Sequence, residues 1–210
     1  MIDLYTWSTP NGRKVSIMLD ECGLEYKVHP INIAKDEQFQ PHFLEIAPNN
    51  RIPAIVDNDN GLSLFESGAI LMYLAEKTGK FWPQEFEKKW RTNEWLMWQM
   101  GGIGPMIGQA HHFIKNNKGV SEYSEERYLN ESKRLYGVLN RRLENTEYMA
   151  GDDYTIADIA TWPWISRFEW HTVDMNEFPN VVRWYKAIAA RPAVEKGYHV
   201  PVEQPGIPMP

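Results

Sequence analysis

The sequence predicts an α/β domain followed by an all-α domain. Short runs of β-forming residues alternate with helical patterns through residue 80, whereas no convincing strand appears from Phe81 onward. The chain has 210 residues, 43% of them hydrophobic, which is enough for two modest cores. We therefore expect domains at residues 1–80 and 87–196, and a proline-rich tail at 197–210 that is extended or disordered.

The N-terminal part has the pattern βαβ–α–ββ–α. The turn Asn58–Gly61 joins the last two strands as a hairpin loop would. A βαβ unit followed by a hairpin and a covering helix is the thioredoxin-like arrangement, in which one mixed sheet has helices on both faces. The expected strands are Ile2–Trp7, Glu25–Ile33, Pro53–Asp57 and Leu62–Phe65, and the expected helices are Arg13–Gly23, Asp36–Ile46 and Ser67–Gly79.

The C-terminal part is predicted to be a helical bundle with a kink or interruption at the glycine-rich segment Gly101–Pro105. Thr155 and Asp158 fit a capping box, which is a structural role. The clustered residues Trp90, Trp95, Trp98, Trp162 and Trp164 are expected in the bundle core, although some could line a substrate pocket. The expected helices are Trp90–Gln99, Ser124–Asn145, Ile156–Trp164 and Phe178–Ala190.

Charge and hydropathy exclude several classes of partner. A net charge of -6 gives no electrostatic footprint for nucleic acid and argues against binding to anionic membrane surfaces. The longest apolar run, Ala69–Ala75, is far shorter than the roughly 20 residues of a membrane span, and the N-terminus lacks the pattern of a signal peptide. We expect a soluble cytoplasmic protein with no nucleic-acid or membrane partner.

Cys22 is the only cysteine, so the chain can form neither an internal disulfide nor a zinc site built on several thiolates. Its place at the end of the first predicted helix indicates a buried small hydrophobe. The adjacent residues His111 and His112 are the remaining metal candidates. Because neighbours on a helix point about 100° apart and no third ligand is evident, we expect no metal.

The first strand-to-helix loop is Thr9-Pro10-Asn11-Gly12. Dithiol oxidoreductases with the thioredoxin-like arrangement carry C-P-x-C at this place, whereas here Thr9 and Gly12 occupy the two thiol positions. A hydroxyl, an amide and a helix N-terminus remain, and these can donate hydrogen bonds to an external thiolate and lower its pKa from about 8.5. The alternative interpretation is that Thr9 is only a turn residue.

Two further segments suit a peptide ligand. Pro53 opens the third strand, and a cis bond before it would turn the backbone of Ile52 outward, where a substrate peptide could pair with it. Glu66-Ser67-Gly68 marks a strand-to-helix junction. There Ser67 is predicted to be an N-cap, with Gly68 in a tight turn, and the same helix N-terminus suits a ligand carboxylate.

Four segments in order resemble a glutathione transferase: Tyr5–Gly12, Ala47–Pro53, Leu64–Leu71 and Tyr154–Ala160. The segment Trp98–Phe113, together with Thr-Pro-Asn, is similar to the bacterial nu class, whose members act as disulfide-bond reductases using bound glutathione. The likeness covers residues 1–196, and the tail has no counterpart. Each motif is weak alone, but the four at fitting spacing are specific.

The resemblance implies roles for individual residues. Thr9 and Asn11 would hold the glutathione sulfur as catalytic residues, and Ser8 could compete with Thr9 for that role. Tyr5 is expected in the core or at a domain contact. The binding set would be the Ile52 backbone with cis Pro53 for the cysteinyl unit, Glu66 and Ser67 for the γ-glutamyl end, Gln38 and Arg51 near the glycyl carboxylate, and Arg127 from the partner subunit.

The resemblance also implies a homodimer that uses glutathione as co-substrate and needs no metal. Three functions remain open. The first is a glutathione-dependent disulfide reductase, in which one glutathione thiolate attacks a disulfide and a second resolves the mixed disulfide. The second is a transferase that conjugates electrophiles or reduces organic hydroperoxides with the same thiolate. The third is a non-catalytic interaction module, against which the intact set of site residues argues.

Overall fold

The structure, a computed structural model, describes residues 1–210. The backbone groups into two compact units. Residues 1–80 and 190–207 form the N-terminal unit, and residues 81–189 and 208–210 form the helical unit. The predicted α/β and all-α classes are confirmed. Residues 190–207, however, group with the N-terminal residues and not with the helices before them.

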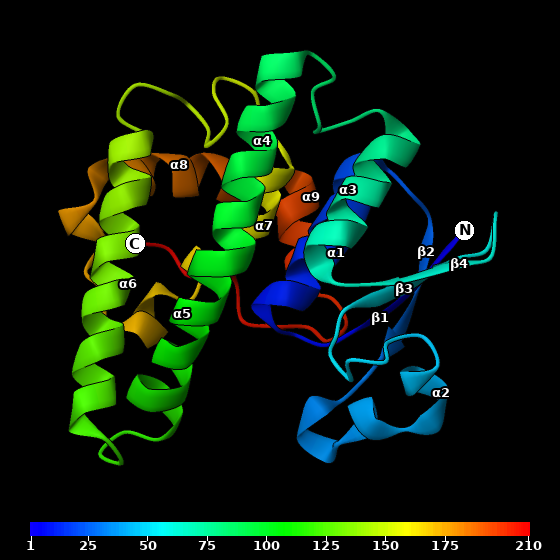
Figure 1. Cartoon of the computed structure of the whole chain (residues 1–210), viewed down its shortest axis with the longest axis horizontal. Helices are drawn as coiled ribbons and strands as arrows, with labels where there is room; N and C mark the ends of the chain where they lie inside the picture. The colour runs from blue at the N-terminus through cyan, green and yellow to red at the C-terminus, as the bar shows by residue number, and fades with distance from the viewer. The chain divides into compact units, whose positions relative to one another are not determined.

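The N-terminal unit is built on a four-stranded mixed sheet (Figure 1). The strand order is β2-β1-β3-β4, with β1 parallel to β2 and antiparallel to β3, and with β3 and β4 forming an antiparallel hairpin. This is the thioredoxin-like topology that the sequence pattern predicts. The strands are β1 (Ile2–Thr6), β2 (Tyr26–Pro30), β3 (Ala54–Asp57) and β4 (Leu62–Phe65).

Alternation along β1 divides the core of this unit between the two faces of the sheet. Ile2 and Leu4 are buried on one face, whereas Tyr5 points to the other, where Phe43 and Ala54 form a second apolar cluster with it. Helices α1 (Pro10–Cys22) and α3 (Ser67–Thr78) pack side by side, and α2 (Pro41–Leu44) lies apart from them (Figure 1). Helices therefore cover both faces of the sheet.

The predicted helix at 36–46 is wrong. The structure has two 3₁₀ turns there, Ile33–Lys35 and Glu37–Phe39, followed by the single turn of α2. Asp36 adopts a left-handed φ of 59° between the two 3₁₀ turns, and Gln40 is extended before Pro41. A residue before proline is disfavoured in the helical region, so a continuous helix is broken twice.

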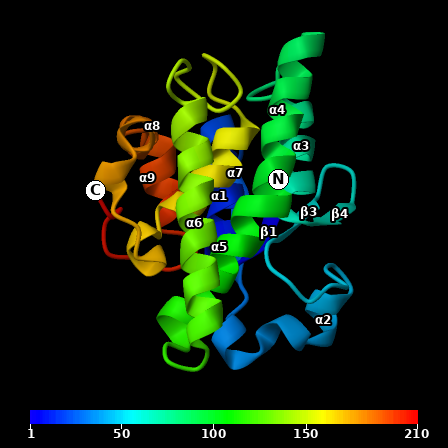
Figure 2. The same ribbon diagram turned by 60° about the vertical axis from the view of Figure 1, so that its left-hand side comes forward.

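The helical unit consists of five α-helices and contains no strand. Figure 2 shows α5 running beside α6, and the two are in contact. The glycine-rich segment does not end its helix. Instead, α4, a π turn at Gln99–Ile103, α5 and a second π turn at His111–Asn116 follow one another without a break, because the wider π turn absorbs the irregularity. The helices are α4 (Phe86–Trp98), α5 (Gly104–Ala110), α6 (Glu122–Arg142), α7 (Ile156–Ile165) and α8 (Pro179–Ala189).

Helix α7 forms the centre of the helical core, since each of its ten residues is buried. Trp162 and Trp164 lie in this core as predicted. The prediction is wrong for Trp90, which is 58% exposed. Helix α4 turns the face with Thr92 and Leu96 inward, so Trp90 is left on the outer face. No helix of the chain combines the length and the apolar character needed to cross a bilayer.

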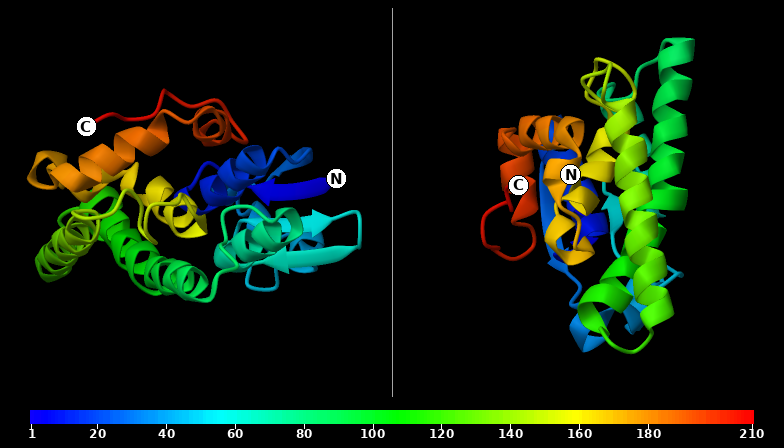
Figure 3. Two further views of the ribbon diagram at one scale, coloured as in Figure 1. Left: turned by 90° about the horizontal axis from the view of Figure 1, so that it is seen from above. Right: turned by 90° about the vertical axis from the view of Figure 1, so that its left-hand side faces the viewer.

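An additional helix, α9 (Pro192–Tyr198), packs along α1 in the N-terminal unit (Figure 3). The two helices approach closely at Gly197, where a Cβ atom would lie only 2.7 Å from the backbone of Ile17. The Ser16 hydroxyl also donates to the Gly197 carbonyl at 2.7 Å. These contacts explain why residues 190–207 belong to the N-terminal unit.

Candidate functional site

The first part of the candidate site is the N-terminus of α1. Thr9 is the N-cap: its side-chain oxygen accepts a hydrogen bond from the Gly12 amide at 3.1 Å. Because a hydroxyl oxygen can accept while its own proton donates, Thr9 still has an O–H to offer a ligand. Pro10 follows at the first helical position, and Asn11 is half-buried beside it. The helix therefore begins three residues earlier than predicted, and its positive dipole end lies in the Thr-Pro-Asn loop.

Gly12 occupies the second thiol position of the dithiol motif, and the backbone leaves no space for any side chain there. A Cβ atom at this residue would lie 2.2 Å from the Trp7 carbonyl oxygen and 2.5 Å from the Thr6 hydroxyl. Both distances are far below van der Waals contact. The loop is thus shaped for one hydroxyl and a helix N-terminus, and not for a pair of cysteines.

A second part of the site lies where the chain enters β3. The Ile52–Pro53 peptide bond is cis, as the resemblance implies. Pro53 is buried and Ile52 is half-buried, while Arg51 is exposed. Because β3 begins at Ala54, Ile52 lies just outside the strand ladder.

A third part is the N-terminus of α3, where the structure corrects the sequence-based interpretation of Ser67. The N-cap position is held by Glu66, which has a left-handed φ of 70° and makes no side-chain cap, so Ser67 is the first helical residue and not the cap. Ser67 is buried, and its hydroxyl accepts a hydrogen bond from the Lys14 ammonium at 3.2 Å. Thus no side chain caps the start of this twelve-residue helix, and Glu66 beside it is exposed.

Gln38 lies in the second 3₁₀ turn and is only 8% exposed. Its Nε2 donates weakly to Asp36 at 3.4 Å, and its buried Oε1 has no hydrogen-bond partner in the chain. A buried carbonyl oxygen without a donor is costly, so this amide fits a ligand that supplies an N–H. The same amide offers its NH₂ group to a carboxylate.

All of the predicted site residues except Arg127 therefore lie in the N-terminal unit. Ser8, the predicted competitor of Thr9, accepts a hydrogen bond from Gln204 at 3.4 Å. Lys14 was missed by sequence reasoning. Its signal was available, because Lys14 stands three and four residues before the apolar Ile17 and Met18, which places a charged residue on the buried side of α1.

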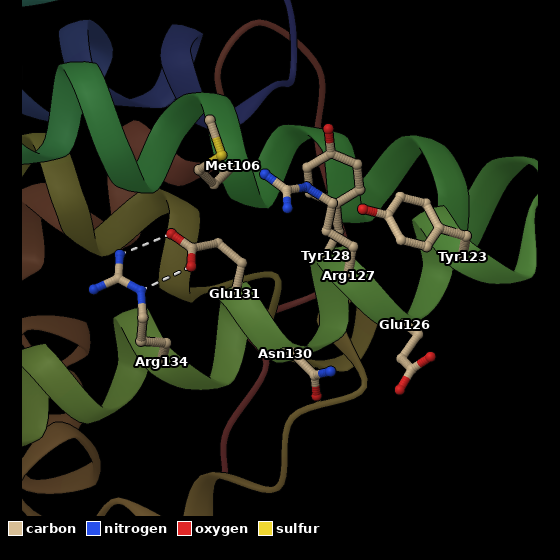
Figure 4. Close-up of a pocket in the computed structure, with 8 residues that line it drawn as sticks. All are labelled: Met106, Tyr123, Glu126, Arg127, Tyr128, Asn130, Glu131 and Arg134. Carbon is tan, nitrogen blue, oxygen red and sulfur yellow. Dashed lines mark hydrogen bonds and ion pairs between the residues drawn. The ribbon is translucent and has the colours of Figure 1, made fainter.

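Arg127 lies on α6 and is exposed in a groove of about 590 Å³ between α5 and α6 (Figure 4). Figure 4 shows its guanidinium beside Tyr128 and Met106, while Glu131 and Arg134 form a two-pronged ion pair at 2.7 Å. No other predicted site residue lines this groove.

The two adjacent histidines take different roles, which agrees with their separation around the helix. His111 Nε2 lies 2.8 Å from Nε2 of the buried His171, whose Nδ1 lies 2.8 Å from the Tyr136 hydroxyl, whereas His112 is exposed. Burial, together with the charge of Arg167, lowers the pKa of His111 to about 4. No group of three or more metal-ligating side chains occurs in the structure.

Comparisons with known proteins agree with this architecture. Residues 1–76 match the glutathione S-transferase N-terminal domain, and residues 103–192 match the glutathione S-transferase C-terminal domain. The disulfide-bond oxidoreductase YfcG of Escherichia coli is 50% identical over 198 residues, covering 92% of each chain. The disulfide-bond oxidoreductase YghU of the same organism is 40% identical over 211 residues, covering 93% of this chain and 73% of YghU.

Solved structures give the same picture. A glutathione transferase from Burkholderia graminis, with two glutathione molecules bound per subunit, is 46% identical to this chain with a TM-score of 0.90. The match covers 95% of this chain and 88% of the Burkholderia protein. A glutathione transferase from Pseudomonas putida, with one glutathione disulfide bound per subunit, is 44% identical to this chain with a TM-score of 0.90. The match covers 95% of this chain and 91% of the Pseudomonas protein. On its sequence, its two domains and its fold, this chain belongs to the glutathione transferase family.

Proposed function

We propose that this protein is a glutathione-dependent disulfide reductase that activates the thiol of bound glutathione at the N-terminus of α1. The observation that carries the proposal is the composition of the first loop. Thr9 presents a hydroxyl at the start of the helix, and Gly12 leaves no room for a second thiol. The reactive sulfur must then come from a ligand.

The protein's own thiol is unsuited to the reaction. Cys22 is 7% exposed, and burial raises the pKa of its thiol, whereas thiol–disulfide exchange needs an accessible thiolate. Cys22 also lies at the far end of the thirteen-residue α1, about 18 Å along the axis from the Thr9 end.

The proposed reaction consumes two glutathione molecules. The first glutathione thiolate attacks one sulfur of the substrate disulfide, a new S–S bond forms, and the other substrate sulfur leaves as a thiolate that takes up a proton. The second glutathione thiolate attacks the mixed disulfide at its glutathione sulfur and releases the remaining substrate thiol and oxidised glutathione. Two electrons pass from the two glutathione thiols to the substrate.

Hydrogen bonds at the start of α1 support each step. The Thr9 hydroxyl and the Asn11 amide group would donate to the attacking sulfur, and the positive end of the helix dipole favours its ionised form. In the second step, the sulfur under attack is the glutathione sulfur that these donors hold, so the two steps share one sulfur site.

The remaining parts of the N-terminal unit fit the glutathione backbone. Glu66 and the uncapped start of α3 would take the ammonium and carboxylate of the γ-glutamyl end, and the Ile52 backbone would pair with the cysteinyl unit. The orphaned Oε1 of Gln38 would accept a ligand N–H, with Arg51 near the glycyl carboxylate. Support comes from the two relatives named as disulfide-bond oxidoreductases and from the relatives with bound glutathione or glutathione disulfide.

The test is the rate at which the protein reduces a small model disulfide with glutathione. Thr9→Val should lower kcat/KM by about 10- to 100-fold, because one hydrogen bond to a charged sulfur is lost. Thr9→Ser, which keeps the hydroxyl, should retain most of the activity, and Cys22→Ala should leave the rate unchanged. Thr155→Val removes the N-cap hydroxyl of α7 and serves as a matched control for the loss of a helix cap.

Two outcomes would contradict the proposal. A full rate for Thr9→Val would remove the hydroxyl from the mechanism, and loss of activity in a folded Cys22→Ala variant would assign the reaction to the protein thiol. Rates on a chloronitroarene and an organic hydroperoxide belong in the same experiment. If either rate far exceeds the disulfide rate, the protein is primarily a conjugating transferase or a peroxidase.

We further propose a two-fold homodimer in the cytoplasm, in which Arg127 approaches the glutathione of the partner subunit. A two-fold interface is the commonest arrangement of soluble oligomers. A reducing compartment suits an enzyme that depends on reduced glutathione. If Arg127 acts in this way, Arg127→Ala should raise the KM for glutathione in the dimer and leave the disulfide KM unchanged.

A further inference from the structure

Lys14 is the one lysine of the chain that is almost completely buried, with 1% of its surface exposed. Its ammonium donates to the Ser67 hydroxyl at 3.2 Å and thereby links α1 to the first residue of α3. Burial lowers the pKa of Lys14 to about 7, and the negative charge of Glu66 opposes this effect in part. A buried lysine is rare without a functional or structural reason.

The hydrogen bond makes the Ser67 oxygen an acceptor toward Lys14. Since the Ser67 oxygen accepts from Lys14, the Ser67 O–H proton is directed away from Lys14. The start of α3 has no side-chain cap. A ligand carboxylate placed there would receive hydrogen bonds from Ser67 and from the first amides of the helix, with the Lys14 charge directly behind the hydroxyl.

We propose that Lys14 is a positioning residue for the γ-glutamyl carboxylate of glutathione: it orients the Ser67 hydroxyl and takes up a proton when that carboxylate binds. The inference rests on the proposed function of this site and adds a proton linkage to it. A ligand carboxylate bound next to Ser67 would lie close to Lys14, and a nearby negative charge stabilises the ammonium form of a lysine over its neutral form. Free protein above about pH 7 holds part of its Lys14 uncharged, so binding should draw a proton from solvent.

The direction of the pH effect follows from this linkage. Binding raises the pKa of Lys14, so the extra affinity is fully present below the pKa of the free protein, about 7, and is lost as the pH rises through the higher pKa of the complex.

Other charged groups around α1 are engaged elsewhere. Arg13, the neighbour of Lys14, is turned to Tyr198, with its Nε 3.2 Å from the carbonyl oxygen and its guanidinium 3.6 Å from the ring centroid. Glu66 is therefore the titratable group whose charge acts on Lys14. Glu76 of α3 is exposed. The other charges on α1, α9, β1, β3 and α3 lie in the ion pairs Lys196–Asp20, Arg191–Glu21, His199–Glu195, His29–Asp3 and Lys77–Asp57.

The experiment is isothermal titration calorimetry of the whole protein with S-methylglutathione between pH 6 and 8. This ligand has no thiol, so thiolate formation cannot contribute to the proton balance. Measurements in phosphate and in Tris, which differ in ionisation heat, give the number of protons exchanged. The wild type should take up a fraction of a proton near pH 7.5, and its affinity should fall several-fold between pH 6 and pH 8.

Lys14→Met should bind about tenfold more weakly at pH 6, with no proton uptake and a flat pH profile. Lys14→Arg keeps its charge across this range and should also give a flat profile, which separates proton linkage from packing. Lys80→Met is the matched control. Lys80 donates to the Cys22 carbonyl at the other end of α1, so this variant should keep the wild-type profile.

The wild-type measurement decides the question even if Lys14→Met does not fold. Binding without proton uptake and with a flat pH profile would overturn the role of Lys14 and leave the glutathione site standing. A Lys14→Met variant that folds and keeps the wild-type proton uptake would also overturn it. Absence of S-methylglutathione binding to the wild type at millimolar concentration would instead overturn the proposed function itself.

Discussion

Gly12 determines which thiol chemistry the first loop can support. The backbone passes so close to this residue that a Cβ atom would lie 2.2 Å from the Trp7 carbonyl oxygen. Gly12→Ala should therefore destabilise the fold by about 2–3 kcal/mol, because the loop must shift to make space. It should also lower disulfide reductase activity, since the Gly12 amide is the donor that holds Thr9 in place. Denaturant unfolding and the model-disulfide assay measure the two effects.

Gly137→Ala is the matched control for this substitution. Gly137 lies within α6, and only an Arg141 nitrogen at 3.7 Å would be near its Cβ atom, so alanine should be neutral or stabilising by up to about 1 kcal/mol. A Gly12→Ala variant as stable as the wild type would show that the loop yields easily. The absence of a second cysteine would then reflect the reaction alone and not the space available.

At the scale of single residues, backbone features of the candidate site were easier to predict from the sequence than contacts between its side chains. The hydroxyl at the start of α1 could be anticipated from the first-loop motif, and the cis bond before Pro53 from the resemblance to glutathione transferases. The sequence predicts Ser67 as the N-cap, whereas Glu66 holds the N-cap position and the Ser67 hydroxyl accepts a hydrogen bond from Lys14. A contact between α1 and α3 depends on tertiary packing, and no local pattern encodes it.

Among the elements, α7 depends most on a single side chain. The Asp158 carboxylate accepts hydrogen bonds from the backbone amides of Met149 and Thr155, from the Thr155 hydroxyl and from the indole of Trp184, all at 2.9–3.2 Å. The predicted capping box is thus confirmed, and three further donors extend it. Burial raises the pKa of Asp158 to about 6, and the hydrogen bonds oppose this effect, so the side chain is ionised at pH 7.

Asp158→Ala should destabilise the helical unit by roughly 3 kcal/mol or more, because it leaves several buried donors without an acceptor. Thermal unfolding measures the loss, and Thr155→Val is the graded comparison, with an expected cost of about 1 kcal/mol for one cap hydroxyl. Equal stabilities of Asp158→Ala and the wild type would mean that water replaces the carboxylate. In that case the buried network would not hold α7 in place.

The prediction of secondary structure was wrong where local backbone conformations interrupt a helical pattern. Residues 36–46 have the composition of an amphipathic helix, yet the left-handed Asp36 and the extended Gln40 divide them into single turns. The kink or interruption expected at Gly101–Pro105 takes the form of a π turn at Gln99–Ile103, which carries the helix on into α5. Helix α9 was hidden within the segment assigned to the helical domain and the tail. Its place follows from the close approach of Gly197 to α1, which is a long-range contact.

At the scale of the whole molecule, the outer face of α4 bears on the proposed assembly. Phe86, Trp90 and Met97 are 79%, 58% and 52% exposed, and their spacing places them on one side of the helix. Large exposed apolar side chains in a row mark interaction surfaces more often than isolated ones do. The error in placing Trp90 in the core is informative here, because a residue that looks like core and is exposed in the single chain suits the interface of a homodimer.

Trp90→Glu should therefore convert the protein from a dimer into a monomer at micromolar concentration. Tryptophan is a frequent hot spot, and a buried charge at its position should weaken association by at least about 2 kcal/mol, or roughly 30-fold. Light scattering after size exclusion should give the wild type a mass near twice 24.5 kDa and the variant a mass near 24.5 kDa. Arg91→Glu places the same residue on α4 away from the apolar face, so this variant should remain dimeric.

If the wild type is monomeric, or if Trp90→Glu stays dimeric, this face is not the interface. If instead the monomer forms and keeps the wild-type KM for glutathione, Arg127 plays no part in the partner's site.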